Sequence, residues 1–394
     1  MRDHVSSDSV VSMTQALVAT DSRNPPGGER SAADVARQLL EPLGCTFEEV
    51  EPEPGRVSLV ARLGEGGRPT LIVNGHLDVV PVSPDGWTRD PFGGAVADGR
   101  VWGRGTADMK GGIAAAIEAV LALGRAGRPL PCDLVFHLVA DEEQGGRLGT
   151  NVLAASGHIV GDACLVPEPT SLAVCVAERG ILTLEVLVHG RAAHASEPRR
   201  GVSAIEKAAK VVLAVHAADF DRSHPLLGSP SANAGLIAGG SGSNVVADRC
   251  LVTVDHRALP GQTESDAVDD VRRLIERIDD PDLRYELRTV VFGEASELAV
   301  GHPWVAQVQG AISAVRGAQA PVVGMTFATD ARFVRNQAGI PAVVCGPGGI
   351  EQAHIDDEFV EVGALLDAAA VYAELMAGFD EQAVALLQTS GRAR

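Results

Sequence analysis

Five short segments rich in histidine and acidic residues contain the side chains of this chain best suited to chemistry. They are NGHLDVV (74–80), GRGTADMKGG (103–112), ADEEQGG (140–146), LVPEPT (165–170) and AHIDDEF (353–359). Most of them follow apolar, β-branched runs, so their polar groups are predicted to stand at the ends of buried strands. Two histidines and several carboxylates in such places form a ligand set for a pair of divalent metal ions, with carboxylates left over for proton transfer.

The first of these segments pairs a histidine with an aspartate. The run LIVNGHLDVV is typical of a buried strand that ends at His76. Because residues i and i+2 of a strand share a face, Asp78 is predicted to lie beside His76. A metal-bound histidine usually donates its other ring N–H to a carboxylate, and Asp78 is placed for that task.

The remaining segments offer further ligands from distant parts of the chain. Asp108 lies between a glycine-rich loop and a predicted helix, and its two oxygens could bridge two metal ions. Glu142 and Glu143 end the strand-like run CDLVFHLVA and would point in different directions, so that one could bind metal while its neighbour faces a water. Glu168 and His354 each follow another strand-like run.

Each segment taken alone has an ordinary explanation. A lone His-X-Asp pair is usually structural or exposed, and an Asp-Glu-Glu run is usually a solvated loop. The glycine-rich GRGTADMKGG lacks the G-x-x-x-x-G-K-[ST] and G-x-G-x-x-G spacings, which argues against a nucleotide-dependent α/β enzyme. The five segments together, mostly at strand ends of an α/β pattern, favour a metal-dependent active site.

Composition narrows the classes of partner and compartment. A chain of 394 residues is long enough for two domains, and its net charge of −19 argues against nucleic-acid and anionic-membrane partners. Residues 1–24 lack the apolar core of a signal peptide, and no run approaches the roughly 18 apolar residues of a membrane span. Six scattered cysteines without a C-x-x-C pair favour buried thiols in a reducing cytoplasm.

The middle of the chain follows a different pattern from its flanks. Residues 179–291 are predicted to form β-α-β-β-α-β, the ferredoxin-like order of an antiparallel sheet covered by two helices. None of the candidate metal ligands lies in this block, so we expect it to be a second domain inserted into a catalytic one. The flanks, 1–178 and 292–394, suit a three-layer α/β fold with a mostly parallel sheet.

With these segments assembled, the chain resembles the M20 metallopeptidase family, in its acetylornithine deacetylase and succinyl-diaminopimelate desuccinylase branch. The resemblance covers almost the whole chain. It is carried by SRNPPGGE, GHLDVVP, GRGTADMKGG, DEEQGG, EPT, ERG, GRAAHAS, DHRALP, TDARF and the His354 segment.

The resemblance implies a role for each candidate ligand. His76 and Glu168 would hold one zinc ion, Glu143 and His354 would hold the other, and Asp108 would bridge the two. Cobalt would be able to substitute for zinc. In the resembling family this position is glutamate in deacylases and carboxypeptidases and aspartate in aminopeptidases. Glu168 therefore resembles the residue of the deacylases and carboxypeptidases.

The same resemblance implies the reaction. Glu142 would be the general acid and base, and Asp78 would orient His76. We therefore expect hydrolysis of an amide bond by zinc-bound hydroxide, which removes an acetyl- or succinyl-like group from an N-acyl amino acid. A dipeptidase or metallocarboxypeptidase with the same site is the alternative enzyme. A non-catalytic binding protein of the same fold is disfavoured, because Glu142 and all five ligands are present.

In the resembling family the inserted domain mediates dimerisation, so a homodimer is expected. His194 resembles a residue that reaches the partner subunit's active site and stabilises the oxyanion, and Asn244 resembles a residue that lines the same pocket. Arg179 and Arg257 resemble binders of a substrate carboxylate, which the planar guanidinium can grip with two hydrogen bonds. For each arginine, an ordinary surface ion pair is the competing interpretation.

Overall fold

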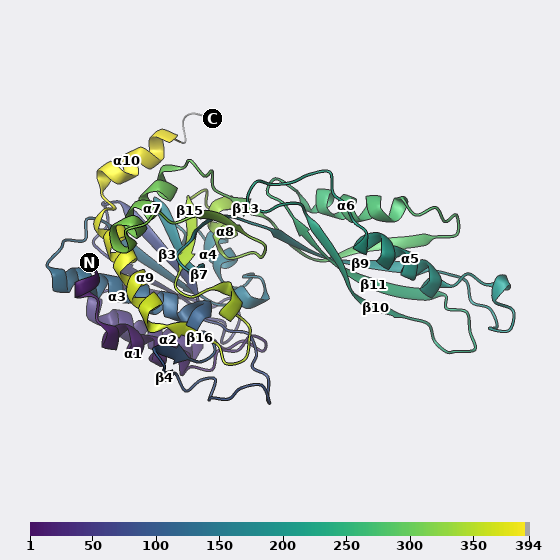
Figure 1. Ribbon diagram of the computed structural model, residues 1–394, viewed down its shortest axis with the longest axis horizontal. Coiled ribbons are helices and arrows are strands. Elements are labelled where there is room, and N and C mark those ends of the chain that lie inside the picture. Colours follow the sequence, from purple (N-terminus) through teal and green to yellow (C-terminus); the bar gives the residue numbers. More distant parts are fainter. Residues whose placement is uncertain (391–394) are drawn as a thin grey trace. The chain divides into compact units, whose positions relative to one another are not determined.

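The computed structural model describes residues 1–390, and the chain divides into two compact units (Figure 1). The first comprises Met1–Val176, Leu298–Val323 and the chain from Thr329 onward. The second comprises Ala177–Glu297 and Gly324–Ala328. This second unit contains the block expected at 179–291 and extends beyond it at both ends.

A mixed sheet forms the centre of the first unit, with strands in the order β1-β2-β6-β3-β7-β15-β8. Its strands are β1 (Thr46–Val50), β2 (Ser58–Leu63), β3 (Thr70–His76), β6 (Asp133–Val139), β7 (Ala163–Pro169), β8 (Val174–Glu178) and β15 (Ala342–Gly346). The four central strands, β6, β3, β7 and β15, run parallel, whereas β1, β2 and β8 join antiparallel. Strands β6, β7 and β15 are buried along their whole length, as parallel strands covered on both faces must be.

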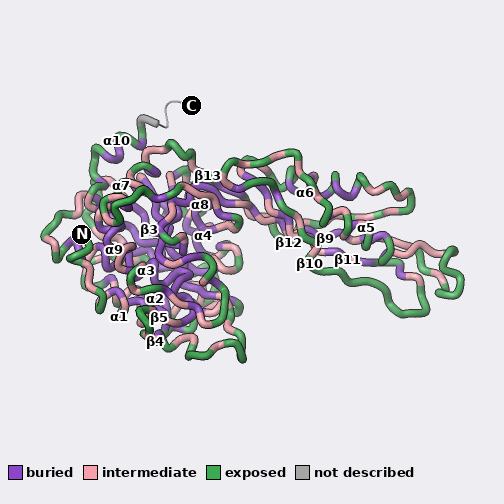
Figure 2. The backbone as a smooth tube through the Cα atoms, viewed as in Figure 1, coloured by how far each residue is buried: buried purple, intermediate pink, exposed green. Residues whose placement is uncertain are grey.

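Helices cover both faces of this sheet. They are α1 (Ser7–Val18), α2 (Arg30–Leu40), α3 (Gly111–Ala126), α4 (Thr150–Ala155), α7 (Pro303–Arg316), α8 (Ala331–Asn336), α9 (Val362–Ala377) and α10 (Glu381–Ser390). Helices α1, α3, α7 and α9 pack on one another, as do α4 and α8, and Figure 1 shows the two groups on either side of the sheet. Figure 2 shows the buried backbone along β3 and α3. The predicted three-layer α/β fold is confirmed.

A separate small sheet and two further strands of the central sheet complete the main-chain pairing. Strands β4 (Ala95–Ala97), β5 (Arg100–Trp102) and β16 (Phe359–Glu361) form a separate three-stranded sheet of the first unit. Strands β13 (Ser296–Glu297) and β14 (Val322–Met325) pair with β8.

The second unit has one antiparallel sheet and two helices. Its elements follow the order β9 (Gly180–His189), α5 (Ala204–His216), β10 (Ser231–Gly239), β11 (Arg249–Ala258), α6 (Glu264–Glu276) and β12 (Arg284–Gly293). The sheet order β10-β11-β9-β12 is that of the predicted ferredoxin-like fold. Residues of β9 alternate between buried and half-buried, and the buried face packs with apolar residues of both helices into one core.

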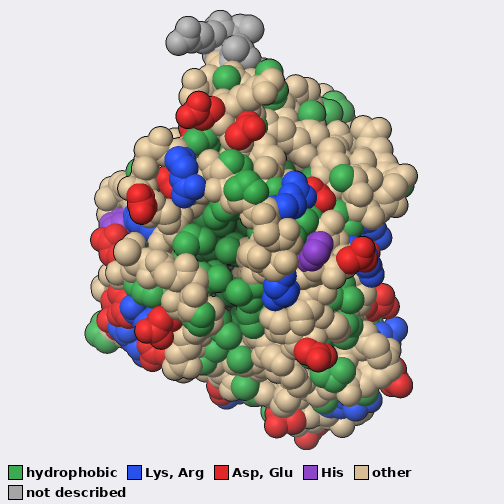
Figure 3. All heavy atoms as spheres, turned by 90° about the vertical axis from the view of Figure 1, so that its left-hand side faces the viewer, with side chains coloured by type: hydrophobic (Ala, Val, Ile, Leu, Met, Phe, Trp, Pro, Cys, Tyr) green, Lys and Arg blue, Asp and Glu red, His purple; other side chains and the backbone are tan. Residues whose placement is uncertain are grey.

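One face of the first unit carries charged side chains of both signs (Figure 3). On the face of the first unit drawn in Figure 3, acidic and basic side chains lie interspersed around an area of hydrophobic ones. Within residues 1–390, no single helix is long and apolar enough to cross a membrane.

Candidate metal centre and active site

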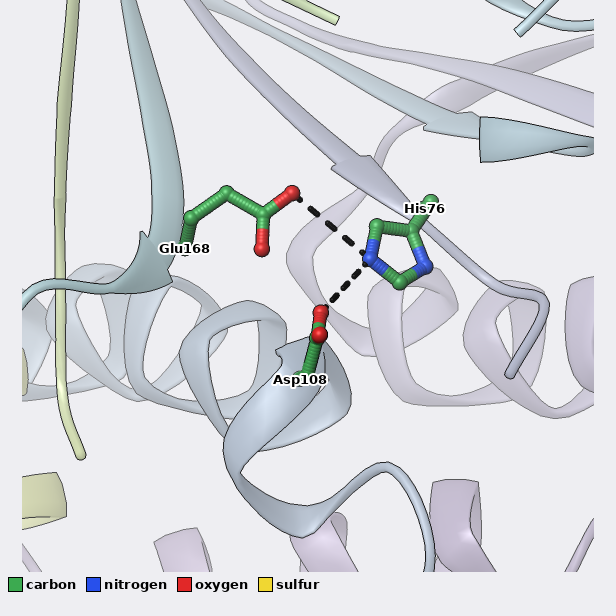
Figure 4. Close-up of side chains that lie close together, drawn as sticks. All are labelled: His76, Asp108 and Glu168. Atoms are coloured by element: carbon green, nitrogen blue, oxygen red, sulfur yellow. Dashed lines mark hydrogen bonds and ion pairs between the residues drawn. The ribbon is translucent and has the colours of Figure 1, made fainter. Parts of the chain in front are cut away.

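Parallel strands bring the first three candidate ligands together. His76 is the last residue of β3 and Glu168 lies at the end of β7, and these strands are parallel neighbours in the sheet. Their carboxyl ends therefore meet at one edge, which is where parallel α/β sheets bind ligands. Asp108 reaches the same edge from a kinked helical turn, Thr106–Lys110, directly before α3, and Figure 4 shows the three side chains pointing toward one another.

The first ligand group is buried and tightly spaced. His76 Nε2 lies 2.9 Å from Asp108 Oδ1 and 3.6 Å from Glu168 Oε1. All three residues are buried, and their ligand atoms lie close enough together to hold one metal ion. Although burial lowers it, the Glu168 and Asp108 carboxylates raise the pKa of His76 well above its usual range.

A second ligand group shares Asp108 with the first. His354 Nε2 lies 3.0 Å from Glu143 Oε2 and 3.3 Å from Asp108 Oδ2. These atoms also lie close enough together to hold one ion. The two oxygens of Asp108 therefore face different imidazoles, which is the geometry of a carboxylate that bridges two cations.

The charges around Asp108 fit a pair of divalent cations. Burial, followed by the Asp108 charge, raises the pKa of Glu168 well above its usual range. Hydrogen bonds to Asp108 and Glu143 raise the pKa of His354 to about 10. Buried carboxylates crowded in this way must be neutralised by protons or cations. Imidazole nitrogens and carboxylate oxygens are ligands that zinc accepts.

Asp78 contacts His76 through a different atom from the one predicted. The main-chain oxygen of Asp78 lies 2.8 Å from His76 Nδ1, at hydrogen-bond distance. Its carboxylate Oδ1 is 3.7 Å from that nitrogen. The carboxylate instead accepts the N–H groups of Glu142 and Glu143, both at 3.2 Å. The side chain of Asp78 therefore fixes the turn that carries both glutamates.

Glu142 is set beside the two ligand groups. Burial raises the pKa of its carboxyl well above the usual range, His76 opposes that shift, and the Asp330 carboxylate adds to it. A carboxyl with a raised pKa can hold and release a proton near neutral pH, which is what general acid–base catalysis requires.

Glu358, in the fifth segment, was not predicted as a site residue, and the structure places its carboxylate against the main chain of Asp108. Its buried carboxylate accepts the N–H groups of Ala107 at 2.9 Å and Asp108 at 3.1 Å, and it pairs with Arg104 at 2.6 Å. Burial raises the pKa of Glu358 to about 7. In the sequence, its place among the acidic residues after His354 was the signal that could have found it. In the structure, His354 and Asp357 of this segment have positive φ angles of 63° and 54°.

In the second unit, the structure brings the segments of His194 and Asn244 together. His194 forms an isolated β-bridge with Val245, and Ala195 donates its N–H to the Asn244 carbonyl at 3.0 Å. Both His194 and Asn244 are exposed, and His194 Nδ1 lies 2.7 Å from the Ser196 hydroxyl.

The two predicted carboxylate-binding arginines differ in their partners. Arg257 forms two hydrogen bonds with Asp255, at 2.7 and 3.2 Å, so its charge is matched within the second unit. Arg179 donates to the Leu227 carbonyl and the Ser231 hydroxyl. Among the described residues it has no carboxylate partner, and its buried Nε has no acceptor. Burial and the Arg257 charge lower the pKa of Arg179.

Comparisons with known proteins agree with this fold and identify relatives of the chain. The chain is 30% identical over 389 residues to acetylornithine deacetylase from Proteus mirabilis, covering 93% of this chain and 94% of that protein. It is 31% identical to succinyl-diaminopimelate desuccinylase from Methylobacterium radiotolerans, covering 95% and 97% of the two chains. These relatives are amide-bond hydrolases by name.

Solved structures share the fold at lower identity. The aminopeptidase PepT from Bacillus cereus superposes with a TM-score of 0.79 at 22% identity, covering 97% of this chain and 100% of that one. The YXEP protein from Bacillus subtilis, a dinuclear metal-binding peptidase of the M20 family, superposes with a TM-score of 0.72 at 16% identity, covering 97% and 99%. The model of peptidase family M20/M25/M40 matches residues 72–378, and the chain belongs to this family of hydrolases.

Proposed function

We propose that the protein hydrolyses the amide bond of an N-acyl amino acid, with an acetyl- or succinyl-like acyl group, using two zinc ions. The observation that carries this proposal is the division of the Asp108 oxygens between His76 and His354, each of which also faces a glutamate. The deacetylase and desuccinylase names of the relatives support the acyl class.

The residues around the ions have distinct tasks in this reaction. When bound, the two metal ions supply Lewis acidity that polarises an amide carbonyl and makes a nearby water more acidic. Glu142 accepts the proton of the attacking water and returns it to the nitrogen of the leaving amine. Asp78 fixes the main chain of Glu142 and Glu143 by accepting both of their N–H groups. Glu358 does the same for Asp108.

The second unit supplies substrate contacts in this proposal. His194 donates an imidazole N–H to the developing oxyanion, and Asn244 lines the same pocket. Arg179 binds the free carboxylate of the substrate, because its own charge is unmatched among the described residues. Arg257 is held by two hydrogen bonds to Asp255, and it lies near enough to Arg179 to lower the pKa of that group.

We further propose that two copies pair through the second unit, so that His194 serves the site of the partner subunit. Strand β10 is an edge strand of its sheet, and Leu236 and Ile237 on it are 70% and 52% exposed. An edge strand with exposed apolar side chains is a surface that natural proteins usually cover. We also propose that the protein works in a reducing cytoplasm. Its six cysteines are free thiols, which supports this proposal.

A substrate panel with controlled metal content tests this function. The purified protein is stripped with a chelator, reloaded with Zn²⁺ or Co²⁺, and assayed against N-acetyl and N-succinyl amino acids and against dipeptides. We expect no activity without metal and preferential cleavage of the N-acyl amino acids after reloading. Preferential cleavage of dipeptides would instead make the protein a dipeptidase. Metal binding without turnover of any amide would leave a binding protein of the same fold.

A further inference from the structure

The turn that carries Glu142 and Glu143 adopts an uncommon main-chain conformation. Asp141, the residue before Glu142, has a φ of +71°, in the left-handed region that non-glycine residues rarely occupy. Such a conformation persists only where the surroundings hold it, and it is concentrated at functional sites. What holds Asp141 therefore determines where the two glutamates point.

The carboxylate of Asp141 is bound on both oxygens. Oδ1 accepts from Arg56 at 2.9 Å and from Asn24 at 3.2 Å, and Oδ2 accepts the main-chain N–H of Leu148 at 3.0 Å. The same Asn24 amide donates to the Asp78 carboxylate at 2.9 Å. Arg56, Asp141, Asn24 and Asp78 thus form one continuous chain of hydrogen bonds that ends on the N–H groups of the two glutamates.

Arg56 is itself fixed in direction by a second acid. Its Nε and one terminal nitrogen contact the two oxygens of Glu29 at 2.9 and 2.7 Å. The side chain of Glu29 has no exposed surface, and those of Arg56 and Asp141 are 12% and 7% exposed. The planar guanidinium is therefore held in one orientation, in which the terminal nitrogen that contacts Glu29 also donates to Asp141.

We propose that Arg56 is a positioning residue for hydrolysis: through Asp141 it holds the turn that presents Glu142 to the reacting water and Glu143 to the second ligand group. The proposal rests on the proposed function for Glu142. For Glu143 it rests only on the ability of the site to bind two ions. The side chain of Arg56 contacts Glu29 and Asp141 and not the two glutamates of the turn, so its effect on them passes through the carboxylate of Asp141.

The test compares Arg56 with a second arginine that also pairs with a largely buried aspartate. Arg68 contacts Asp133 Oδ1 through Nε at 2.9 Å and through a terminal nitrogen at 2.6 Å, and neither residue belongs to the chain of hydrogen bonds that ends at the glutamates. Arg56→Gln, Arg56→Lys and Arg68→Gln are each titrated with Zn²⁺ by calorimetry and with Co²⁺ by visible absorption, and their kcat and KM are measured. Folding is checked by circular dichroism.

We expect Arg56→Gln to weaken binding of one of the two ions by about 10- to 100-fold, as loss of partners behind metal ligands generally does. We also expect its kcat to fall at least about 10-fold with KM little changed, since misplacement of a catalytic group acts on the chemical step. Lysine can bridge only part of the gap between Glu29 and Asp141. The ion affinity and kcat of Arg56→Lys should therefore lie between those of Arg56→Gln and the wild type. Arg68→Gln should match the wild type.

Ion binding separates this proposal from the proposed function. A wild type that binds two ions but cleaves no amide would overturn the hydrolase proposal, and Arg56 would still be judged by the calorimetric and Co²⁺ readouts. Arg56→Gln with two ions bound as tightly as in the wild type and an unchanged Co²⁺ spectrum would overturn the positioning role. If Arg56→Gln does not fold, Arg56→Lys decides in the same way.

Discussion

A buried histidine in the central sheet allows the pH dependence of stability to be worked out away from the metal ligands. His137 lies in β6 with no exposed surface, and burial, aided by the Arg62 charge, lowers the pKa of its imidazole from 6.5 to about 3. Between these two values the unfolded chain binds a proton that the folded chain excludes. The stability that depends on neutral His137 is therefore complete above pH 6.5 and is lost progressively as pH falls toward 3.

The magnitude follows from the distance between the assay pH and the unfolded value. Each pH unit inside this window changes the free energy of unfolding by about 1.4 kcal/mol for one proton. At pH 5, about 1.5 units below the unfolded pKa, the loss relative to pH 8 is about 2 kcal/mol. No reduction for solvent screening applies, because the ring is fully buried.

The assay compares the wild type with a variant of similar volume that cannot titrate. His137→Leu should lose about 2 kcal/mol less than the wild type between pH 8 and pH 5. The metal-free proteins are unfolded in urea at both pH values and followed by circular dichroism, so that metal ligation does not contribute. His216→Gln, which changes an exposed histidine of α5, should behave as the wild type. Equal pH dependence in the wild type and His137→Leu would refute the reasoning.

Three further predictions concern the site. Asp78→Asn should lower kcat and weaken binding of the ion at Glu143 more than binding of the ion at Glu168, because it disturbs the turn rather than the ring of His76. Calorimetric titration with Zn²⁺ measures the two affinities. Mixing His194→Ala with Glu142→Gln chains should restore part of the lost activity, since one site of each mixed dimer keeps both residues; verified subunit exchange without recovery would count against sharing. Arg179→Ala should reduce kcat/KM by at least 10-fold for a substrate acid and much less for its carboxamide, because only the acid loses a charge-assisted pair.

The order of elements and the grouping of ligands could be predicted because both follow from short-range patterns. Strands β3, β6 and β7 are apolar runs with polar residues at their carboxyl ends, and parallel neighbours must place those ends together. The ferredoxin-like block was equally readable from its alternating strands and periodic helices. The family resemblance added which glutamate faces which group, a detail that spacing alone left open between Glu142 and Glu143.

The direction of the Asp78 side chain could not be read from the same rule. The alternation of side chains holds only while the strand continues, and β3 ends at His76. Beyond that residue the chain turns, and Asp78 directs its carboxylate toward the glutamate turn while its carbonyl faces the imidazole. Partners such as Glu29 and Arg56 come from loops, where no periodicity indicates which distant residue they meet.

The protonation of the ligand groups determines how the site takes up metal. Without ions, neighbouring carboxylates raise the pKa of His76 and of His354, the latter to about 10, and burial raises the pKa of Glu168. His354 therefore keeps its proton at neutral pH, His76 and Glu168 hold theirs to a higher pH than usual, and each must lose its proton to bind an ion. Because groups with a raised pKa release protons as pH rises, competition falls and metal affinity should increase from pH 6.5 to pH 8. Zinc titrations in two buffers of different ionisation enthalpy measure the protons released, and we expect at least about one per ion. Binding with no proton release and no pH dependence would mean that these carboxylates and imidazoles are not the ligands.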